Sequence, residues 1–501
     1  MDARDNDWNA PCVPGGPAMT ADVVVIGGGA AGLTASQVAA AAGRRVILVE
    51  RDRLGGECLF TGCIPSKTLL AVAKRVRNAR AASSLGLTVL GAPAWPEVRA
   101  ELRRSIQSFR ERDGLQALQA GGVRVVRGAA RFTAPRVLTV RCGEHTHDIH
   151  ARAFVLATGS VPNTPPIAGL EDVPFLTHET LFDLPQQPTH LLVVGGGAVG
   201  CEVTQAFTRL GSDVTLVHGE ARLLPTDEPE ASEALLSVLR AEGATVHLDS
   251  TVERVERSGG GVVAFLSTGE AVHASHLFLA TGKRPNVEGF GLEVIGAAFD
   301  EHGLKVDARM RSTTVPYVWG AGDVVGGLMF THGATERGTL AALGALGPLG
   351  RLVARWWTRH ARVERIPWVT FTTPEIAHWG LAEAEAVRRH GRRVEVVEYD
   401  YRHLDRAVTD REAGFVKLVA LRGLFGSPVG MRVVGVQVVG GPAGELAQLL
   451  SLSARLGFHP LRLALTPAPY PTYAEAARQA SLGLMVRGRA FGVRRPGRAA
   501  P

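Results

Sequence analysis

Two copies of one pattern constrain the fold of this 501-residue chain more than any other feature. Each copy runs from an apolar segment of strand length through G-x-G-x-x-G and a helix of small residues to a second apolar segment. The copies span residues 22–50 and 190–218. The glycines of such a unit allow a tight turn, close approach of backbone to a pyrophosphate and close packing of helix on strand. We therefore expect an α/β protein with two Rossmann-like dinucleotide-binding domains.

The first copy carries a complete set of nucleotide-binding residues. Gly27, Gly29 and Gly32 fill the three glycine positions, and Glu50 ends the second strand. A carboxylate at that strand end accepts hydrogen bonds from the ribose hydroxyls.

The second copy differs at its strand end. Gly195, Gly197 and Gly200 fill the glycine positions, but His218 stands where the acid would be. An acid would repel a 2′-phosphate, so its absence permits NADPH. No arginine stands at the strand end itself, and Arg222 lies a few residues beyond it. On the missing acid we predict NADPH, with NADH as the alternative.

Two dinucleotide-binding folds in one chain indicate two dinucleotides, most simply a nicotinamide that passes a hydride to a flavin. Three later segments support a flavin site. Thr158 and Gly159 lie in VLATGS, and Gly282 lies in FLATGKRPN, each after an apolar strand. Asp323 follows a strand and two glycines in VPYVWGAGDVV, where it could bind a ribityl hydroxyl.

The cysteines are few and odd in number, and most lie far apart. They are Cys12, Cys58, Cys63, Cys142 and Cys201. This is not the pattern of a disulfide framework, and it favours a cytoplasmic enzyme in which a close pair is catalytic or binds metal.

Charge and hydropathy exclude two classes of partner. The net charge of +7 comes mainly from scattered arginines, and no module of interleaved aromatic and basic residues occurs, so we expect no nucleic acid. The N-terminus has no signal-peptide pattern, and no segment reaches the roughly 18 apolar residues of a membrane span. We expect a soluble protein.

The motif GGECLFTGCIPSK holds the close pair, Cys58 and Cys63. On an ideal helix their Cα atoms would be about 8 to 9 Å apart, beyond the roughly 7 Å reach of a disulfide. Gly55, Gly56 and Gly62 supply the freedom to distort the segment. The spacing does not suit zinc, and no second ligand pair lies nearby. A reducible disulfide close to the flavin explains the pair best; the alternative is two buried, unbonded cysteines, and we predict no metal site.

With these motifs the chain resembles the flavoprotein pyridine nucleotide-disulfide oxidoreductases, the family of glutathione reductase, dihydrolipoamide dehydrogenase and mercuric reductase. The similarity runs from about Ala21 to about Leu484, and CLFTGCIPSK is its most specific part. The resemblance implies FAD on the first fold, NAD(P)H on the second, and a homodimer formed through a C-terminal α+β dimerisation domain.

The resemblance also implies roles for individual residues. Cys58 would attack the substrate, and Cys63 would lie against the flavin ring. Gly56 and Lys67 would lie at the flavin, with Glu202 as the ion-pair partner of Lys67; the alternative is that the last two are surface charges.

The expected domain boundaries follow from the positions of these motifs. They are a flexible extension (1–20), the FAD-binding domain in two parts (21–162 and 285–355), the NAD(P)-binding domain (163–284), the dimerisation domain (356–485) and a basic tail (486–501).

One position departs from the family pattern. The family has a histidine near the C-terminus with a glutamate five residues later, and both reach the partner's disulfide. Here Glu475 is present, but Tyr470 replaces the histidine. A tyrosine, with a pKa near 10, is a poor base at neutral pH, whereas a histidine near 6.5 is a good one. His332 could replace the base or merely cap a helix, and His459 is a weaker candidate because it precedes a helix-ending proline.

Tyrosine at this position is similar to mercuric reductase, although the C-terminal cysteine pair and the N-terminal metal-binding domain of that enzyme are missing. We predict an FAD-dependent NAD(P)H oxidoreductase that passes electrons through a Cys58–Cys63 disulfide to a small-molecule acceptor, either a soft metal ion or a small disulfide. The alternatives are a dihydrolipoamide dehydrogenase and a redox-sensing flavoprotein without turnover.

Overall fold

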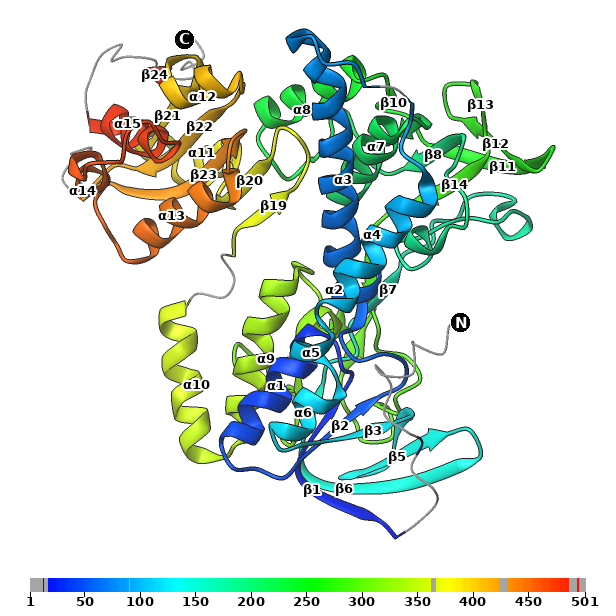
Figure 1. The fold of residues 1–501 in the computed structure, drawn as a ribbon. Coiled ribbons are helices and arrows are strands. Elements are labelled where there is room, and N and C mark those ends of the chain that lie inside the picture. Colours follow the sequence, from blue (N-terminus) through cyan, green and yellow to red (C-terminus); the bar gives the residue numbers. More distant parts are fainter. Residues whose placement is uncertain are drawn as a thin grey trace.

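The computed structural model describes residues 12, 17–89, 91–361, 366–423, 430–485 and 493–494. Three sheets with their helices form three lobes (Figure 1): the first sheet at the bottom, the second at the upper right and the C-terminal sheet at the upper left. The expected fold class is confirmed, with two Rossmann-like units and a C-terminal α+β domain.

The first sheet has the strand order β3-β2-β1-β6-β5-β4, and β18 also pairs with β6. The central strands are parallel and almost fully buried, which explains their continuous runs of valine, isoleucine and leucine. The strands are β1 (Met19–Ile26), β2 (Val46–Glu50), β3 (Val123–Arg127), β4 (Ala129–Ala134), β5 (Val137–Cys142), β6 (His145–Leu156) and β18 (Val318–Gly320). Helices α1 (Ala30–Ala41) and α9 (Thr331–Ala345) pack on each other and on this sheet.

The second sheet has the order β10-β9-β8-β14, and all its strand pairs are parallel. Its strands are β8 (His190–Val194), β9 (Asp213–Val217), β10 (Thr245–His247) and β14 (His276–Leu279). Helix α7 (Ala198–Leu210) is the crossover between β8 and β9, and its buried side shares a core with helix α3 (Cys63–Ala81).

The C-terminal sheet has the order β19-β20-β23-β22-β21-β24. Its strands are β19 (Trp368–Thr370), β20 (Ile376–Gly380), β21 (Val394–Asp400), β22 (Phe415–Leu421), β23 (Arg432–Val439) and β24 (Val493–Arg494). Helices α13 (Ala443–Arg455) and α15 (Ala474–Met485) bury their apolar sides against it, as expected of strands followed by a helix.

The other elements connect or cover these sheets. The helices are α2 (Gly56–Phe60), α4 (Trp95–Gln107), α5 (Arg110–Asp113), α6 (Leu115–Ala120), α8 (Pro229–Ala241), α10 (Pro348–Ala361), α11 (Glu383–His390), α12 (Asp405–Asp410) and α14 (Pro460–Leu465). The strands are β7 (Ser160–Pro162), β11 (Val252–Ser258), β12 (Gly261–Leu266), β13 (Ala271–Ala274), β15 (Lys283–Pro285), β16 (Phe299–Asp300) and β17 (Gly303–Leu304). The short 3-10 turn Gly322–Val325, η5, precedes α9.

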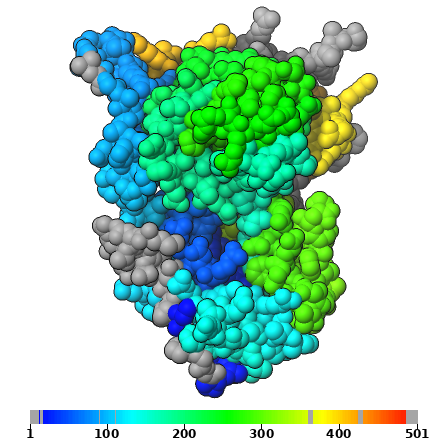
Figure 2. Space-filling view, turned by 90° about the vertical axis from the view of Figure 1, so that its right-hand side faces the viewer, coloured from blue at the N-terminus to red at the C-terminus, as the bar shows by residue number. Residues whose placement is uncertain are grey.

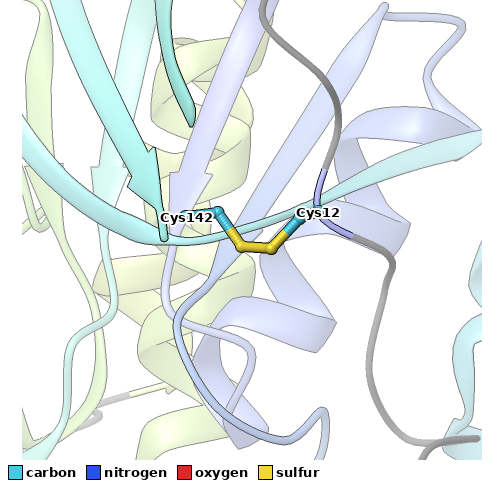
Figure 3. Close-up of a disulfide and its surroundings, with 2 residues drawn as sticks. All are labelled: Cys12 and Cys142. Atoms are coloured by element: carbon cyan, nitrogen blue, oxygen red, sulfur yellow. A yellow bond between two sulfur atoms is a disulfide. The ribbon is translucent and has the colours of Figure 1, made fainter. Parts of the chain in front are cut away.

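The expectation that the distant cysteines are unpaired is wrong for two of them. A disulfide joins Cys12 to Cys142, the last residue of β5, with their Cα atoms 5.8 Å apart (Figure 3). Sequence separation hid this pairing, because the two residues are 130 positions apart and only the folded sheet brings them together. The structure therefore attaches Cys12 to the first sheet.

Candidate active site

The redox motif lies where two helices meet. Helix α2 ends at Phe60 and α3 begins at Cys63, so Thr61 and Gly62 interrupt what would otherwise be one helix. A Cβ atom at Gly62 would lie 2.9 Å from the carbonyl oxygen of Glu57, which is too close for any other residue type. The distortion expected around the cysteine pair is therefore present, and glycine is what allows it.

Cys58 and Cys63 are free thiols in this structure, in contrast to the expected disulfide. Their side chains are hydrogen-bonded to each other, and the Cys63 sulfur lies 3.2 Å from Thr331 Oγ1 at the start of α9. The hydrogen bond from Cys58 lowers the pKa of Cys63 to about 6 against the opposing effect of burial, with Thr331 and the positive charge of Lys67 contributing. The same hydrogen bond, with burial, raises the pKa of Cys58. The pair is thus a thiol that donates to a thiolate.

Lys67 and Glu202 form the expected ion pair. Lys67 Nζ lies 2.8 and 3.0 Å from the two carboxylate oxygens, and Glu202 is only 5% exposed, so the alternative of surface charges is excluded. Glu202 Oε1 also accepts the backbone N–H of Phe371 at 2.9 Å, and Lys67 lies over the Phe371 ring. The pair therefore connects α3, α7 and the loop between β19 and β20.

The first glycine turn fits a pyrophosphate. Gly27 has φ +104°, and a Cβ there would meet the Ala157 carbonyl oxygen. A Cβ at Gly32 would overlap the Gly27 carbonyl oxygen, whereas nothing lies within 4 Å of one at Gly29. Gly27 and Gly32 are thus needed for close backbone packing, and Gly29 leaves open space for a ligand. Glu50 accepts the N–H of Gly28 at 2.6 Å and so holds the turn beside that space.

The second glycine turn repeats this arrangement. Gly195 has φ +116°, a Cβ at Gly200 would overlap the Gly195 carbonyl oxygen, and Gly197 faces open space. The ring of His218 lies against Gly196, its Nε2 atom has no hydrogen-bond partner, and burial lowers its pKa. His218 therefore carries no positive charge at neutral pH that could attract a 2′-phosphate.

Asp323 belongs to a charged cluster that sequence reasoning missed. Its Oδ2 accepts Lys283 Nζ at 2.9 Å and Ser160 Oγ at 2.8 Å, and Lys283 also binds Glu57 at 3.0 Å. Burial would lower the pKa of Lys283, but Glu57 and Asp323 outweigh it and the net shift is upward. Lys283 is one of only five lysines, and that scarcity was the available signal.

The two loops expected to close the nucleotide domains lie together. Strand β7 follows Gly159 and pairs with β15, which follows Gly282. Thr158 Oγ1 donates to the Asn286 carbonyl oxygen at 2.6 Å, and Asn286 N donates to the Gly159 carbonyl oxygen at 3.0 Å. This pairing joins the first lobe to the second.

The residues at the family's histidine and glutamate positions lie in the C-terminal domain. Tyr470 is 78% exposed and donates its hydroxyl proton to Asp405. Glu475 is paired with Arg478 and Gln479 in its own helix. Among the described residues of the single chain, the structure shows no hydrogen bond from Tyr470 or Glu475 to the cysteine pair.

Neither histidine is a free base. His332 is the second residue of α9, its Nε2 bonds the Pro367 carbonyl oxygen at 2.7 Å, and its ring stacks on Phe330. His459 caps α14 by accepting the N–H of Leu461. The expectation that a proline ends a helix after His459 is wrong, because that proline begins α14, where its missing N–H costs no hydrogen bond.

The surface is hollowed next to the motif. In Figure 2 a depression separates the green second lobe from the cyan first lobe, and blue residues from the first part of the chain lie at its bottom. A groove of about 310 Å³ also runs between α3 and α4, and Ile64, Lys67 and Phe109 are among its lining residues.

No described helix is long and apolar enough to cross a membrane.

Fold and site together define a class: a two-nucleotide reductase in which a cysteine pair lies beside the first nucleotide site. The chain belongs to the pyridine nucleotide-disulphide oxidoreductase family, whose model matches residues 21–338, and the family's dimerisation domain matches residues 366–481. The family uses FAD and NAD(P)H, and both glycine turns fit such dinucleotides.

Similar proteins include mercuric reductases, dihydrolipoyl dehydrogenases and a glutathione reductase. A mercuric reductase of Streptomyces lividans is 36% identical over 92% of this chain and 95% of its own length. A dihydrolipoyl dehydrogenase of Thermus scotoductus is 34% identical over 93% of this chain and 97% of its own. The crystal structure of LpdA from Mycobacterium tuberculosis has a TM-score of 0.81 and 27% identity, covering 93% of this chain and 100% of that chain.

Proposed function

We propose that the protein is a homodimeric NADPH-dependent flavoprotein reductase whose electrons leave through a Cys58–Cys63 pair to a soft metal ion. In each cycle the disulfide takes up two electrons and one proton to become a thiol–thiolate pair. The pair then gives two electrons to the metal ion, releases that proton and returns to the disulfide. Bound FAD would supply the two-electron transfer between nicotinamide and cysteines.

Tyr470 is the observation that carries this proposal. A dithiol substrate must lose protons to a base as a disulfide forms, and a neutral phenol bonded to Asp405 is a poor base. A metal ion held by soft thiolates needs no such base. The likeness to a mercuric reductase points the same way.

The other residues support the same chemistry. Thiolate character at Cys63 suits the sulfur next to the flavin, whereas Cys58 would lose its proton as its sulfur binds the acceptor. The ion pair of Lys67 and Glu202 would fix α3 against α7 between the two nucleotide sites. Glu50, Asp323 and the glycine turns would hold FAD, and the turn at Gly195 would hold the nicotinamide nucleotide.

The test compares acceptors anaerobically. Purified FAD-loaded enzyme should oxidise NADPH in sustained turnover with thiol-complexed Hg(II), and at least tenfold more slowly with lipoamide. Cys58→Ser should abolish the Hg(II) reaction and controls for direct reduction by free thiols. Preference for lipoamide would overturn the proposal.

Dihydrolipoamide dehydrogenase remains the second candidate, because a relative of that name is 34% identical. Restoring the family's histidine with Tyr470→His should raise lipoamide turnover if that lineage is close. No gain would count against this candidate.

A further inference from the structure

Tyr470 is held by a residue far away in the chain. It lies between α14 and α15, and its hydroxyl donates to Asp405 Oδ2 at 2.9 Å. Asp405 is the first residue of α12, 65 positions earlier. Apart from this contact the side chain of Tyr470 is largely exposed.

Glu475 cannot be the carboxylate that positions Tyr470. Its oxygens accept Arg478 Nε at 2.8 Å and Nη2 at 2.7 Å, and Gln479 Nε2 at 2.7 Å. The Arg478 hydrogen bonds are the main reason that the pKa of Glu475 is lowered. This carboxylate is therefore turned into its own helix.

A phenol has one proton to donate and lone pairs to accept with. Because the Tyr470 hydroxyl donates its hydrogen bond to Asp405, its oxygen can act only as a hydrogen-bond acceptor toward other groups. The same hydrogen bond raises the pKa of Tyr470, which keeps the phenol neutral. Arg406 is paired with Asp410, and Arg478 with Glu475. The charge that acts on the Tyr470 hydroxyl is therefore that of Asp405.

We propose that Asp405 is a positioning residue, which accepts a hydrogen bond from the Tyr470 hydroxyl and directs the oxygen of the neutral phenol, as an acceptor, toward the substrate at the cysteine pair of a second copy of the chain. This role rests on the proposed function, because Tyr470 must reach that second copy. The role also specifies the substrate class. A cation or a hydrogen-bond donor is attracted to the phenol oxygen, whereas a free thiolate is repelled by its lone pairs. Tyr470 does not donate to a thiolate in this arrangement.

A second tyrosine–aspartate pair provides a matched control. Tyr473 donates to Asp410 Oδ2 at 3.1 Å and so joins the same two parts of the chain. Its ring packs on Tyr401 and against Gly441 within its own domain. Tyr473→Phe therefore removes the same kind of bond and leaves Tyr470, Asp405 and the Arg406–Asp410 pair in place.

The experiment measures turnover of the FAD-loaded dimer with thiol-complexed Hg(II) in Asp405→Ala, Asp405→Asn, Tyr470→Phe, the double variant Asp405→Ala/Tyr470→Phe, and Tyr473→Phe. We expect Asp405→Ala and Tyr470→Phe each to lower kcat about tenfold with the KM for NADPH unchanged, and the double variant to lose no more than Tyr470→Phe. Asp405→Asn, whose amide oxygen still accepts the hydrogen bond, should keep more than half of the activity. Tyr473→Phe should stay within twofold of the original protein.

A readout without turnover separates the two levels of failure. The phenol ionisation of Tyr470, obtained as the ultraviolet difference from Tyr470→Phe, should begin at lower pH in Asp405→Ala. If it does not shift, or if Asp405→Ala keeps full turnover while Tyr470→Phe loses it, the role of Asp405 is wrong and the proposed function stands. If the ionisation shifts but Tyr470→Phe retains full Hg(II) turnover, Tyr470 does not act on the substrate, and both the role and its basis in the proposed function are overturned.

Discussion

At the scale of single residues, the two thiols of the redox motif have opposite tendencies. Cys63 receives a hydrogen bond from Cys58 and is close to Thr331 and Lys67, whereas Cys58 is the donor; both thiols are half-buried. The positions of the two residues on either side of one helix break produce this difference. A single environment cannot stabilise two adjacent thiolates, because like charges disfavour each other.

The pKa of Cys63 sets the pH range over which its thiolate should titrate. Because the pKa of Cys63 is lowered to about 6, the thiolate-to-flavin absorbance of the two-electron-reduced enzyme should be full at pH 8 and should fall as the pH drops through about 6. Lys67→Met removes a positive charge and leaves Glu202 uncompensated, so the midpoint should move to higher pH.

Lys74→Met, in the same helix but exposed, is the control for this titration and should leave the midpoint in place. Cys63→Ser should remove the absorbance at every pH. An absorbance that survives in Cys63→Ser would show that another thiol faces the flavin.

Residues with one strict local requirement could be predicted from the sequence. Gly27 and Gly32 were predictable because a backbone turn and a close helix contact exclude a Cβ. Asp405, Lys283 and Thr331 were not, since each gains its role from a partner many positions away. The Cys12–Cys142 bond escaped prediction for the same reason.

At the scale of elements, the strand–turn–helix unit occurs twice with the same division of tasks among its glycines. In the second unit Gly200 lets α7 approach β8, and Gly197 leaves space beside the helix N-terminus. Apolar runs of strand length around the glycine motifs predicted both units, and strand-like segments together with the family resemblance predicted the C-terminal sheet. It did not predict the break between α2 and α3, which depends on one glycine and a backbone contact.

Two alanine substitutions should separate these tasks. Gly200→Ala should destabilise the FAD-loaded protein by about 1–3 kcal/mol, because a methyl group must be forced against the Gly195 carbonyl oxygen. Gly197→Ala should change the free energy of unfolding by less than about 0.5 kcal/mol, yet raise the KM for NADPH at least tenfold. Urea unfolding and steady-state kinetics measure the two effects, and an unchanged KM in Gly197→Ala would place the phosphates elsewhere.

At the scale of the whole molecule, one buried lysine fastens the second lobe to the C-terminal domain. Lys417 on β22 is 1% exposed, and its Nζ lies 3.0 Å from Glu228 and Glu230 and 2.8 Å from Glu383. Burial would lower the pKa of Lys417, but hydrogen bonds to Glu383 and Glu228 and the nearby negative charges outweigh it, and the net shift is upward. The lysine is therefore charged and balanced by two carboxylates of the second lobe and by Glu383 of its own domain.

Lys417→Met should cost about 3–5 kcal/mol of unfolding free energy, because it leaves the buried carboxylate of Glu228 without its cation. Lys305→Met is the control: Lys305 pairs with Asp300 at the surface, and such pairs contribute about 0–1 kcal/mol. Urea unfolding of both variants decides the matter, and equal small losses would mean that the lobes are joined by other contacts.

The first sheet has a consequence for how the chain is made. Strand β18 adds to β6 although the whole second sheet lies between them in the sequence. Domains generally fold as they leave the ribosome, the N-terminal one first. Here the strands of the second sheet all emerge before β18 does, so the later-encoded lobe can finish folding while the first still waits for its last strand. The first lobe therefore begins to be synthesised before the second but can be completed only after it. A nascent chain halted before residue 318 has no β18 to complete the flavin domain.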